Sequence, residues 1–182
     1  DGAKKLLEES GWTDTDGDGY ADKDGQKLTI NWLTYPTRLE QPKLAEYAQA
    51  TLKDIGIDVQ VNNTSDHRTF AENGDFDVYV SSTTTAPTGD PEYFFTSTVV
   101  GAKNYGNYQN EEVTKLTDQL HQTFDKDERA KLAVELQQDI LDDDAFFFVS
   151  HLNMGIVTKS NVTGMAAHPC DYYEITADLD VE

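Results

Sequence analysis

The architecture of the chain can be worked out from residues 27–82, which read KLTINWLTYPTRLEQPKLAEYAQATLKDIGIDVQVNNTSDHRTFAENGDFDVYVSS. Three segments of this stretch alternate apolar with polar residues, the period typical of strands; they are 27–35, 57–63 and 76–82. Between them, apolar residues recur at helical spacing, which predicts helices at 41–55 and 66–73. The order strand, helix, strand, helix, strand predicts an α/β fold in which helices cover a sheet.

The segments on either side fit the same plan. Residues 2–10 are expected to form a short helix with Leu6 and Leu7 turned inward. Three helices are expected at 91–98, 113–124 and 125–140, followed by a buried strand at 145–152 and short pieces at 155–160 and 162–165. The apolar face of the second of these helices is Val113, Leu116, Leu120 and Phe124. Asp125 and Glu128 form the capping box of the third. Without repeats or linkers, residues 1–182 are predicted to form a single α/β lobe, a mixed sheet flanked by helices.

The charge of the chain limits its partners. Its 182 residues include 14 Lys and Arg against 34 Asp and Glu, a formal net charge of −20. Phosphate backbones and anionic lipid heads repel such a surface, so no nucleic-acid partner is expected. No apolar run approaches the roughly 18 residues of a membrane-spanning helix. The chain starts at Asp1 with neither Met nor a signal peptide, so we expect a processed protein or a fragment.

Residues 13–25, TDTDGDGYADKDG, form an acidic loop with the pattern of a structural calcium site. Carboxylates at alternate positions around a glycine turn can supply the oxygens that a hard divalent cation needs. The predicted metal ligands are Asp14, Asp16, Asp18, the carbonyl of Tyr20, and Asp22. Gly25 stands where the pattern has a bidentate Glu, so Asp22 or Asp24 would have to close the site, and affinity should be weakened. The alternative is a solvated acidic turn without an ion.

Other metal and catalytic patterns are weak or absent. His168 and Cys170 together could hold a soft transition metal only with outside help, and a surface turn is the alternative. Cys170 is the one cysteine, which excludes an internal disulfide. The chain has no GxGxxG, GxxxxGK[ST] or GxSxG motif. It is therefore not expected to be an enzyme.

A second loop, 83–91, follows the third predicted strand and is rich in hydroxyl groups. Residues 81–91 read SSTTTAPTGDP and end in a Gly-Asp-Pro turn before an aromatic segment. Ligands of open α/β sheets favour the crevice beyond the carboxyl ends of the strands, where these hydroxyls can bind a polar ligand. The predicted ligand-binding residues are Ser82, Thr83, Thr84, Thr85, Thr88 and Tyr93. An ordinary surface loop is the alternative from composition alone.

The order of motifs resembles the last lobe of bacterial ABC-transporter solute-binding proteins of the peptide, dipeptide and nickel class, solute-binding protein family 5. The similar segments, in chain order, are AKKLLEESGW with the acidic loop, PKLAEYAQATLKDIGIDVQV, FAENGDFDVYV, TGDPEYFFTS, YGNYQNEEVTKLTDQL, KDERAKLAVELQQDILDD and FFFVSHLNMGIV. The resemblance extends over nearly all 182 residues. The ordered series is far more specific than any one of its pieces.

This resemblance implies the C-terminal lobe of a type II periplasmic-binding-protein-like fold. The whole protein would have a further N-terminal lobe, close on its ligand and deliver it to the membrane permease of an ABC transporter. It would lie outside the cytoplasm, in the periplasm or at the cell surface, as a lipoprotein anchored through the missing N-terminus. Residues 83–91 would face the ligand cleft, and the cargo would be a nickel complex or a short peptide.

The loop sequence bears on which cargo is expected. Peptide-binding relatives often carry an acidic residue shortly before the Gly-Asp-Pro turn, where this chain has Pro87 and Thr88. Nickel-binding relatives often show Ala-Pro-aromatic-Asp-Pro, to which residues 86–91 are similar with one extra residue, but threonines stand where aromatics are expected. The comparison favours a nickel complex over oligopeptides.

Two other functions compete with this interpretation. A freestanding calcium-stabilised interaction domain would be closed on all sides. A hydrolase would have a deep pocket containing an acid or base with a strongly shifted pKa. A transport-receptor lobe would instead expose a polar and aromatic face.

Overall fold

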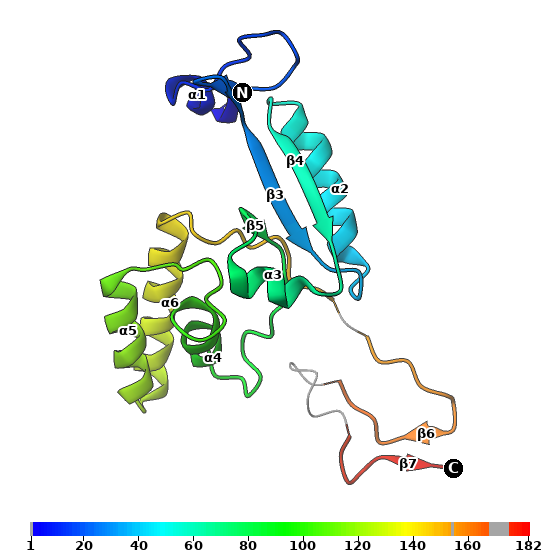
Figure 1. The fold of residues 1–182 in the computed structure, drawn as a ribbon. Helices are drawn as coiled ribbons and strands as arrows, with labels where there is room; N and C mark the ends of the chain where they lie inside the picture. Colours follow the sequence, from blue (N-terminus) through cyan, green and yellow to red (C-terminus); the bar gives the residue numbers. More distant parts are fainter. Residues whose placement is uncertain (1, 154, 168–174) are drawn as a thin grey trace. The chain divides into compact units, whose positions relative to one another are not determined.

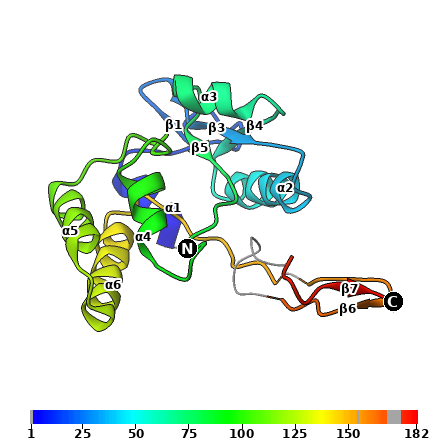
Figure 2. The ribbon, with the colours of Figure 1, turned by 90° about the horizontal axis from the view of Figure 1, so that it is seen from below.

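The computed structural model describes residues 2–153, 155–167 and 175–182 (Figure 1, Figure 2). The chain divides into two compact units, Asp1–Ser82 and Thr83–Glu182, and each has buried apolar side chains of its own. The single lobe expected for 1–182 stays a prediction. His168 and Cys170, the candidate soft-metal pair, lie outside the described residues. In the described part, none of the helices has the length and apolar character needed to cross a membrane.

A three-stranded parallel sheet forms the centre of the first unit. Its strands are β3 (Thr29–Thr34), β4 (Asp58–Asn63) and β5 (Val78–Tyr79). The middle strand is β3, with Ile30 opposite Val59 in β4 and Leu33 opposite Tyr79 in β5. All three predicted strands are confirmed, and the third is much shorter than 76–82. The carboxyl ends of the strands consequently meet at one edge of the sheet.

Two helices connect these strands, as the periodicity predicts (Figure 1). They are α2 (Glu40–Lys53) and α3 (His67–Asn73). The buried apolar residues of this layer are Leu33, Ala45, Ile57, Val59 and Ala71. After α2 the chain turns at Gly56, whose φ of +88° favours glycine. The Gly56 carbonyl accepts a hydrogen bond of 2.7 Å from Ala21 N, which ties the end of the acidic loop to this turn.

The N-terminal helix α1 (Gly2–Glu9) forms as predicted, but its apolar face is not fully buried. Leu6 is 65% exposed and Leu7 is half-buried, so the expectation that both point inward is wrong for Leu6. Leu6 lines a shallow hollow beside Trp12 and Ile57, and nothing among the described residues fills that hollow. The end of the predicted acidic loop forms a short strand, β1 (Asp22–Lys23), which pairs with β2 (Gln26–Lys27) in an antiparallel hairpin.

Two neighbouring helices carry most of the core of the second unit. Helices α5 (Glu111–Gln122) and α6 (Lys126–Asp142) lie side by side in both views (Figure 1, Figure 2). The short helix α4 (Glu92–Phe94) and the π-helical turn η1 (Phe95–Val99) pack against them. The buried core consists of Phe94, Phe95, Val99, Val113, Leu116, Leu120, Leu132, Ala133, Leu136 and Ile140.

Both long helices of this unit begin at a capping side chain. The side-chain oxygen of Asn110 accepts two backbone N–H bonds at the start of α5, and that of Asp125 does the same for α6. The predicted cap at Asp125 is therefore confirmed. The capping box is only half formed, because Glu128 pairs with Lys131 at 3.1 Å instead of reaching back to the cap.

The end of α5 differs from the prediction. The helix stops at Gln122 and the backbone becomes extended at Thr123, with φ −96° and ψ 126°. Phe124 therefore lies beyond the helix and is 92% exposed, so its assignment to the apolar face is wrong. The physical reason is that a tight connection to α6 leaves no further helical turn to carry Phe124 inward.

The expected buried strand at 145–152 is also wrong. Among the described residues this segment is not paired with another strand, and neither is 155–160. A strand needs the backbone groups of a neighbour, and within the described residues none lies against it. One side still packs: Phe146 makes edge contact with Phe94 and Tyr108, whereas Phe147 is 89% exposed. Only a short ladder forms later, between β6 (Val162–Thr163) and β7 (Asp180–Val181).

Truncating the core of the second unit should destabilise it strongly. Leu136 is fully buried between α5 and α6, so Leu136→Ala removes packing and leaves a cavity. We expect the free energy of unfolding to fall by about 2–5 kcal/mol in urea titrations followed by far-UV circular dichroism. Val134→Ala, on the exposed side of the same helix, is the matched control and should change it by less than about 0.5 kcal/mol. Equal losses in the two variants would contradict the described core.

Candidate functional site

The carboxyl-terminal end of the hydroxyl-rich loop is held by one arginine. Arg129, in the first turns of α6, donates from Nε to Asp90 Oδ2 at 2.9 Å and from Nη2 to Asp90 Oδ1 at 2.6 Å. Arg129 Nη2 also donates to Glu92 Oε2 at 2.8 Å. A bidentate pair of this kind is among the strong hydrogen bonds of proteins. The Arg129 side chain is 15% exposed and that of Glu92 21%, whereas that of Asp90 is 41% exposed, so water screens the Glu92 pair less than the Asp90 pair.

The Arg129 guanidinium also bonds to carbonyl groups at the end of α5. Arg129 Nη1 donates to the carbonyl oxygens of Leu120 at 2.7 Å and Thr123 at 2.6 Å. Carbonyls at the end of a helix lack a partner inside it, so these bonds replace bonds to water. Arg129 thus makes five hydrogen bonds, which matches its five N–H donors. One side chain joins the loop, α4, α5 and α6.

The hydrogen bonds that join Arg129 to Asp90 and Glu92, called the clamp below, shift the pKa values of all three groups. Hydrogen bonds from Arg129 hold the pKa of Asp90 below its ordinary value, and burial only partly opposes the effect. Arg129 and then His121 lower the pKa of Glu92, whose Oε1 lies 2.6 Å from His121 Nδ1. The two carboxylates in turn raise the pKa of Arg129. The clamp is therefore a charged network at neutral pH.

The predicted ligand-binding residues fall into one loop and the helix after it. Thr83, Thr85 and Thr88 are exposed and Thr84 is half-buried. Within the described part of the chain, their four hydroxyls form no hydrogen bond. These groups are consequently available to a polar ligand. Ser82 also lies exposed, with its backbone amide bonded at 3.0 Å to the hydroxyl of Tyr35.

Tyr93 differs from the other predicted ligand residues because it already has a partner. Lys103 Nζ donates to the Tyr93 hydroxyl at 3.1 Å and lies 5.4 Å from the ring centroid. Tyr93 sits in α4, next to the clamp residue Glu92, and is 38% exposed. Its hydroxyl can still accept a second hydrogen bond.

Sequence patterns indicated no role for Arg129, nor for a cluster of aromatic rings in the first unit. Asp90 and Arg129 are 39 residues apart, and no local spacing indicates that they meet. The rings of Tyr35 and His67 stack at 4.1 Å, and His67 Nδ1 lies 2.6 Å from the hydroxyl of Tyr79. The position of the rings could have predicted the cluster, because each lies at or soon after the carboxyl end of a strand.

The acidic loop folds as successive turns closed by its own carboxylates. Asp14 accepts from the amides of Gly17 at 2.7 Å and Gly19 at 3.0 Å. Asp16 and Asp18 each accept from the amide two residues further on. Ligand oxygens of Asp14, Asp16 and Asp18 come within 4.8 Å of one another, and all three residues are exposed. Three of the five predicted metal ligands are therefore gathered around one point.

The other two predicted ligands are less favourably disposed. Asp22 is bonded to Thr15, its Oδ2 accepting from the amide at 3.0 Å and the hydroxyl at 3.2 Å. It does not belong to the group formed by the three aspartates. The amide of Tyr20 donates to Asp18 Oδ1 at 2.9 Å, and the role of the Tyr20 carbonyl as a ligand stays a prediction. Lys27 Nζ lies 2.6 Å from Asp18 Oδ2, and this contact lowers the pKa of Asp18. A cation would have to compete with that ammonium.

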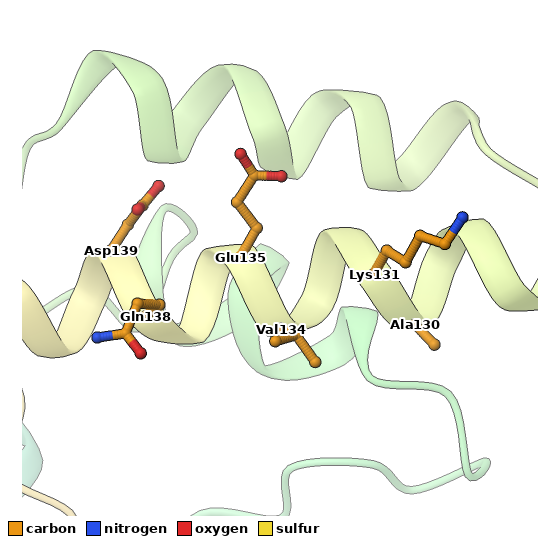
Figure 3. Close-up of a pocket in the computed structure, with 6 residues that line it drawn as sticks. All are labelled: Ala130, Lys131, Val134, Glu135, Gln138 and Asp139. Carbon is orange, nitrogen blue, oxygen red and sulfur yellow. The ribbon is translucent and has the colours of Figure 1, made fainter.

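A shallow hollow on the second unit adds no catalytic constellation. Its lining residues all come from one helix, α6, as Figure 3 shows. They are Ala130, Lys131, Val134, Glu135, Gln138 and Asp139. A hollow on the outer side of one helix does not surround a ligand. It lacks the depth that the hydrolase alternative requires.

The chain was compared with known protein families and with curated relatives. Residues 1–106 match the family model described as bacterial extracellular solute-binding proteins, family 5 Middle. The oligopeptide-binding protein AppA of Bacillus subtilis is 30% identical over 179 residues, 95% of this chain and 33% of AppA. The nickel-binding protein NikA of Staphylococcus aureus is 27% identical over 183 residues, 99% of this chain and 35% of NikA. The chain thus spans about a third of the length of these relatives.

Solved structures agree with these matches. AppA of Bacillus subtilis in complex with a nonapeptide aligns with a TM-score of 0.67 and 30% identity, over 79% of this chain and 30% of AppA. A nickel ABC transporter protein from Bacillus halodurans aligns with a TM-score of 0.68 and 33% identity, over the same shares. The predicted α/β fold of the type II periplasmic-binding class is confirmed.

Removing the arginine should loosen the second unit. Arg129→Gln loses the bidentate bond and leaves Asp90 and Glu92 without their cation, so we expect the free energy of unfolding to fall by roughly 2 kcal/mol at neutral pH, the size typical of hydrogen bonds to charged groups that water partly screens. Because Arg129 lowers both carboxyl pKa values, its stabilising effect is present above their ordinary values of 3.8 and 4.5 and is lost as the pH falls through the lowered ones. The difference between wild type and variant should therefore shrink in acid.

Urea titrations at a series of pH values test this. Lys131→Gln is the matched control, because Lys131 is exposed and pairs only with Glu128 on its own helix. It should change stability by less than about 0.5 kcal/mol at every pH. An Arg129→Gln deficit that stays constant from neutral pH into acid would argue against the carboxylates as its cause.

Proposed function

The chain belongs to the bacterial extracellular solute-binding proteins of family 5, and we propose that it forms the ligand-binding lobe of an ABC-transporter substrate-binding protein. The observation that supports this most is that the matched residues 1–106 include the entire hydroxyl-rich loop, whose threonines are free to bind. The family consists of binding proteins rather than enzymes, in agreement with the absence of catalytic motifs from the sequence. The lobe would act by gripping a solute, with no bond made or broken.

The proposed cargo is a nickel complex or a short peptide. Curated relatives carry both kinds of name, an oligopeptide-binding protein at 30% identity and a nickel-binding protein at 27%. Residues 81–89 contain no charged side chain, so the loop would hold its ligand through hydroxyls and backbone groups. Pro87 and Thr88 leave no acid for a peptide amine in front of Asp90, and Asp90 itself is engaged by Arg129. These features favour the nickel complex.

We further propose that the whole protein has two lobes and works with a membrane permease. A further N-terminal lobe would close on the solute, and the loaded protein would deliver it to a membrane permease. Relatives spanning about three times this length support that arrangement. The family is extracellular, and we propose a periplasmic or cell-surface location with a lipid anchor near the N-terminus. A net charge of −20 would favour neutral or cationic cargo over anions.

Ligand binding by the full-length protein tests this function. Isothermal titration calorimetry with Ni²⁺ plus L-histidine, and separately with a nonapeptide, should give binding to one of the two probes. The double variant Thr84→Ala/Thr85→Ala should weaken that binding about tenfold, since each lost hydrogen bond is worth about 0.5–1.5 kcal/mol.

Thr114→Ala is the matched control, because this exposed threonine lies in α5 and bonds only to the carbonyl of Asn110. Its affinity for either probe should equal that of the wild type. Native mass spectrometry of protein purified from its source would identify a retained ligand. If the double variant binds with unchanged affinity and still retains the ligand, the loop is not part of the binding site.

We also propose that the acidic loop, residues 13–25, binds a structural calcium ion. Asp14, Asp16 and Asp18 provide the oxygens, and the Tyr20 carbonyl and Asp22 complete the set after a local rearrangement. The ammonium of Lys27 and the missing bidentate Glu should limit affinity to the range of extracellular modules, about 10⁻⁴–10⁻³ M. The ion would stabilise the connection between α1 and the β1–β2 hairpin.

Thermal unfolding with and without calcium tests this site. Millimolar CaCl₂ should raise the melting temperature of the wild type by a few degrees, because the ion binds the folded loop and not the unfolded chain. Asp16→Asn should abolish the rise. Glu8→Gln, at an exposed carboxylate of α1 outside the loop, should keep it. A rise that survives Asp16→Asn, or no rise in the wild type, would refute the assignment.

A further inference from the structure

Three aromatic rings gather where the strands of the parallel sheet end. Tyr35 directly follows β3, Tyr79 is the last residue of β5, and His67 opens the helix that follows β4. Each of the three strands therefore leads to one ring. In open α/β sheets this edge is the one beyond which ligands bind.

The rings form a connected cluster. Tyr35 and His67 are stacked, with centroids 4.1 Å apart and planes 23° from parallel. His67 Nδ1 lies 2.6 Å from the hydroxyl of Tyr79, whose ring is 5.7 Å from that of Phe76. Tyr35 is buried, and His67 and Tyr79 are half-buried. The imidazole thus lies between two tyrosines, stacked on one and hydrogen-bonded to the other.

The cluster reaches the ligand loop through one hydrogen bond. The Tyr35 hydroxyl accepts from the backbone amide of Ser82 at 3.0 Å. Ser82 comes immediately before the four loop threonines and belongs to the same compact unit as the three rings. The chain between β5 and Ser82 has no ladder partner beyond the Val80 amide, which bonds to Leu33. The Tyr35 hydroxyl is therefore the last fixed point before the loop starts.

We propose that His67 is a positioning residue for the ligand loop: by stacking on Tyr35 and bonding to Tyr79 it holds the Tyr35 hydroxyl where it fixes the Ser82 amide. This inference rests on the proposed function for its consequence in solute binding. The anchor itself can be measured without any ligand. His67 would touch neither the solute nor the threonines, and would act only through Tyr35.

The charges around the imidazole give the anchor a pH dependence. Burial and the neighbouring Arg68 lower the pKa of His67 below its ordinary value of 6.5, and Asp66 opposes them. The groups facing it are the ring of Tyr35, directly after β3, and the ring of Tyr79 at the end of β5, both of which bear a hydroxyl. The neutral imidazole is favoured in the folded cluster. Its stabilising effect is complete above pH 6.5 and is lost as the pH falls through the lowered pKa.

Amide hydrogen exchange at Ser82 in the full-length protein tests the proposal. Tyr35→Phe keeps the stacked ring and removes the acceptor, so the Ser82 protection factor should fall about tenfold, the equivalent of one hydrogen bond. His67→Ala removes the stack and should lower it similarly. His67→Phe keeps a stacked ring that cannot titrate. It should retain protection and lose the decline that we expect of the wild type as the pH falls through the lowered pKa of His67.

The controls separate positioning from general stability. Tyr47→Phe, at an exposed tyrosine of α2, should leave Ser82 exchange unchanged. Amides within β3 should keep their protection in Tyr35→Phe and His67→Phe. Unchanged Ser82 exchange in both Tyr35→Phe and His67→Ala overturns the inference. So does a loss of amide protection across β3 as large as the loss at Ser82 in these two variants, because it would mean a general loss of stability.

Solute binding then distinguishes this inference from the proposed function. If Ni²⁺ with L-histidine or the nonapeptide binds, Tyr35→Phe should weaken binding severalfold and His67→Phe should flatten its pH profile. Ser82 exchange that responds as expected in a protein that binds neither probe would count against the proposed function and support the anchor. Binding that is unaffected by a measured loss of Ser82 protection would overturn the role of the anchor in the loop.

Discussion

The second unit depends on one guanidinium, carried by α6, that bonds carboxylates and carbonyls of the loop, of α4 and of the end of α5. Arg129 uses its donors on Asp90, Glu92 and the last carbonyls of α5. A lysine could not replace it, because a single ammonium cannot bond a carboxylate side-on and also reach two carbonyls. The clamp leaves the loop in front of Asp90 without internal hydrogen bonds from its threonines in the described residues. A rigid end and free hydroxyls are what a binding loop needs.

The two ends of the hydroxyl-rich loop, residues 83–91, are held by different interactions, a neutral hydrogen bond at the start and a charged network at the end. At the start, a neutral ring cluster holds the Ser82 amide through the hydroxyl of Tyr35. At the finish, a charged network holds the Asp90 carboxylate. The first is sensitive to protonation of His67, whose pKa is lowered from 6.5, and the second to protonation of Asp90, whose pKa is lowered from 3.8. Each anchor lies within its own compact unit, so the loop is the covalent link between two separately stabilised parts.

Local patterns in the sequence were sufficient for most elements but not for their partners. Period-two alternation predicted β3 and β4, helical spacing predicted α2, α5 and α6, and Asp125 was recognised as a cap. The spacing rules failed for 145–152, where a run of phenylalanines reads as a buried strand but has no described neighbour to pair with. The three aspartates of the acidic loop come together because they are adjacent in sequence. Arg129 and the rings at the strand ends needed tertiary structure, since their contacts join distant residues.

Residues 145–152, which pair with no other strand among the described residues, expose Phe147 and Val149. An apolar segment outside any sheet can pair with a copy of itself in another molecule. Mutual repulsion among molecules with a net charge of −20 opposes such stacking, and added salt weakens that repulsion. Self-association through residues 145–152 should therefore increase with ionic strength wherever no other part of the protein covers them.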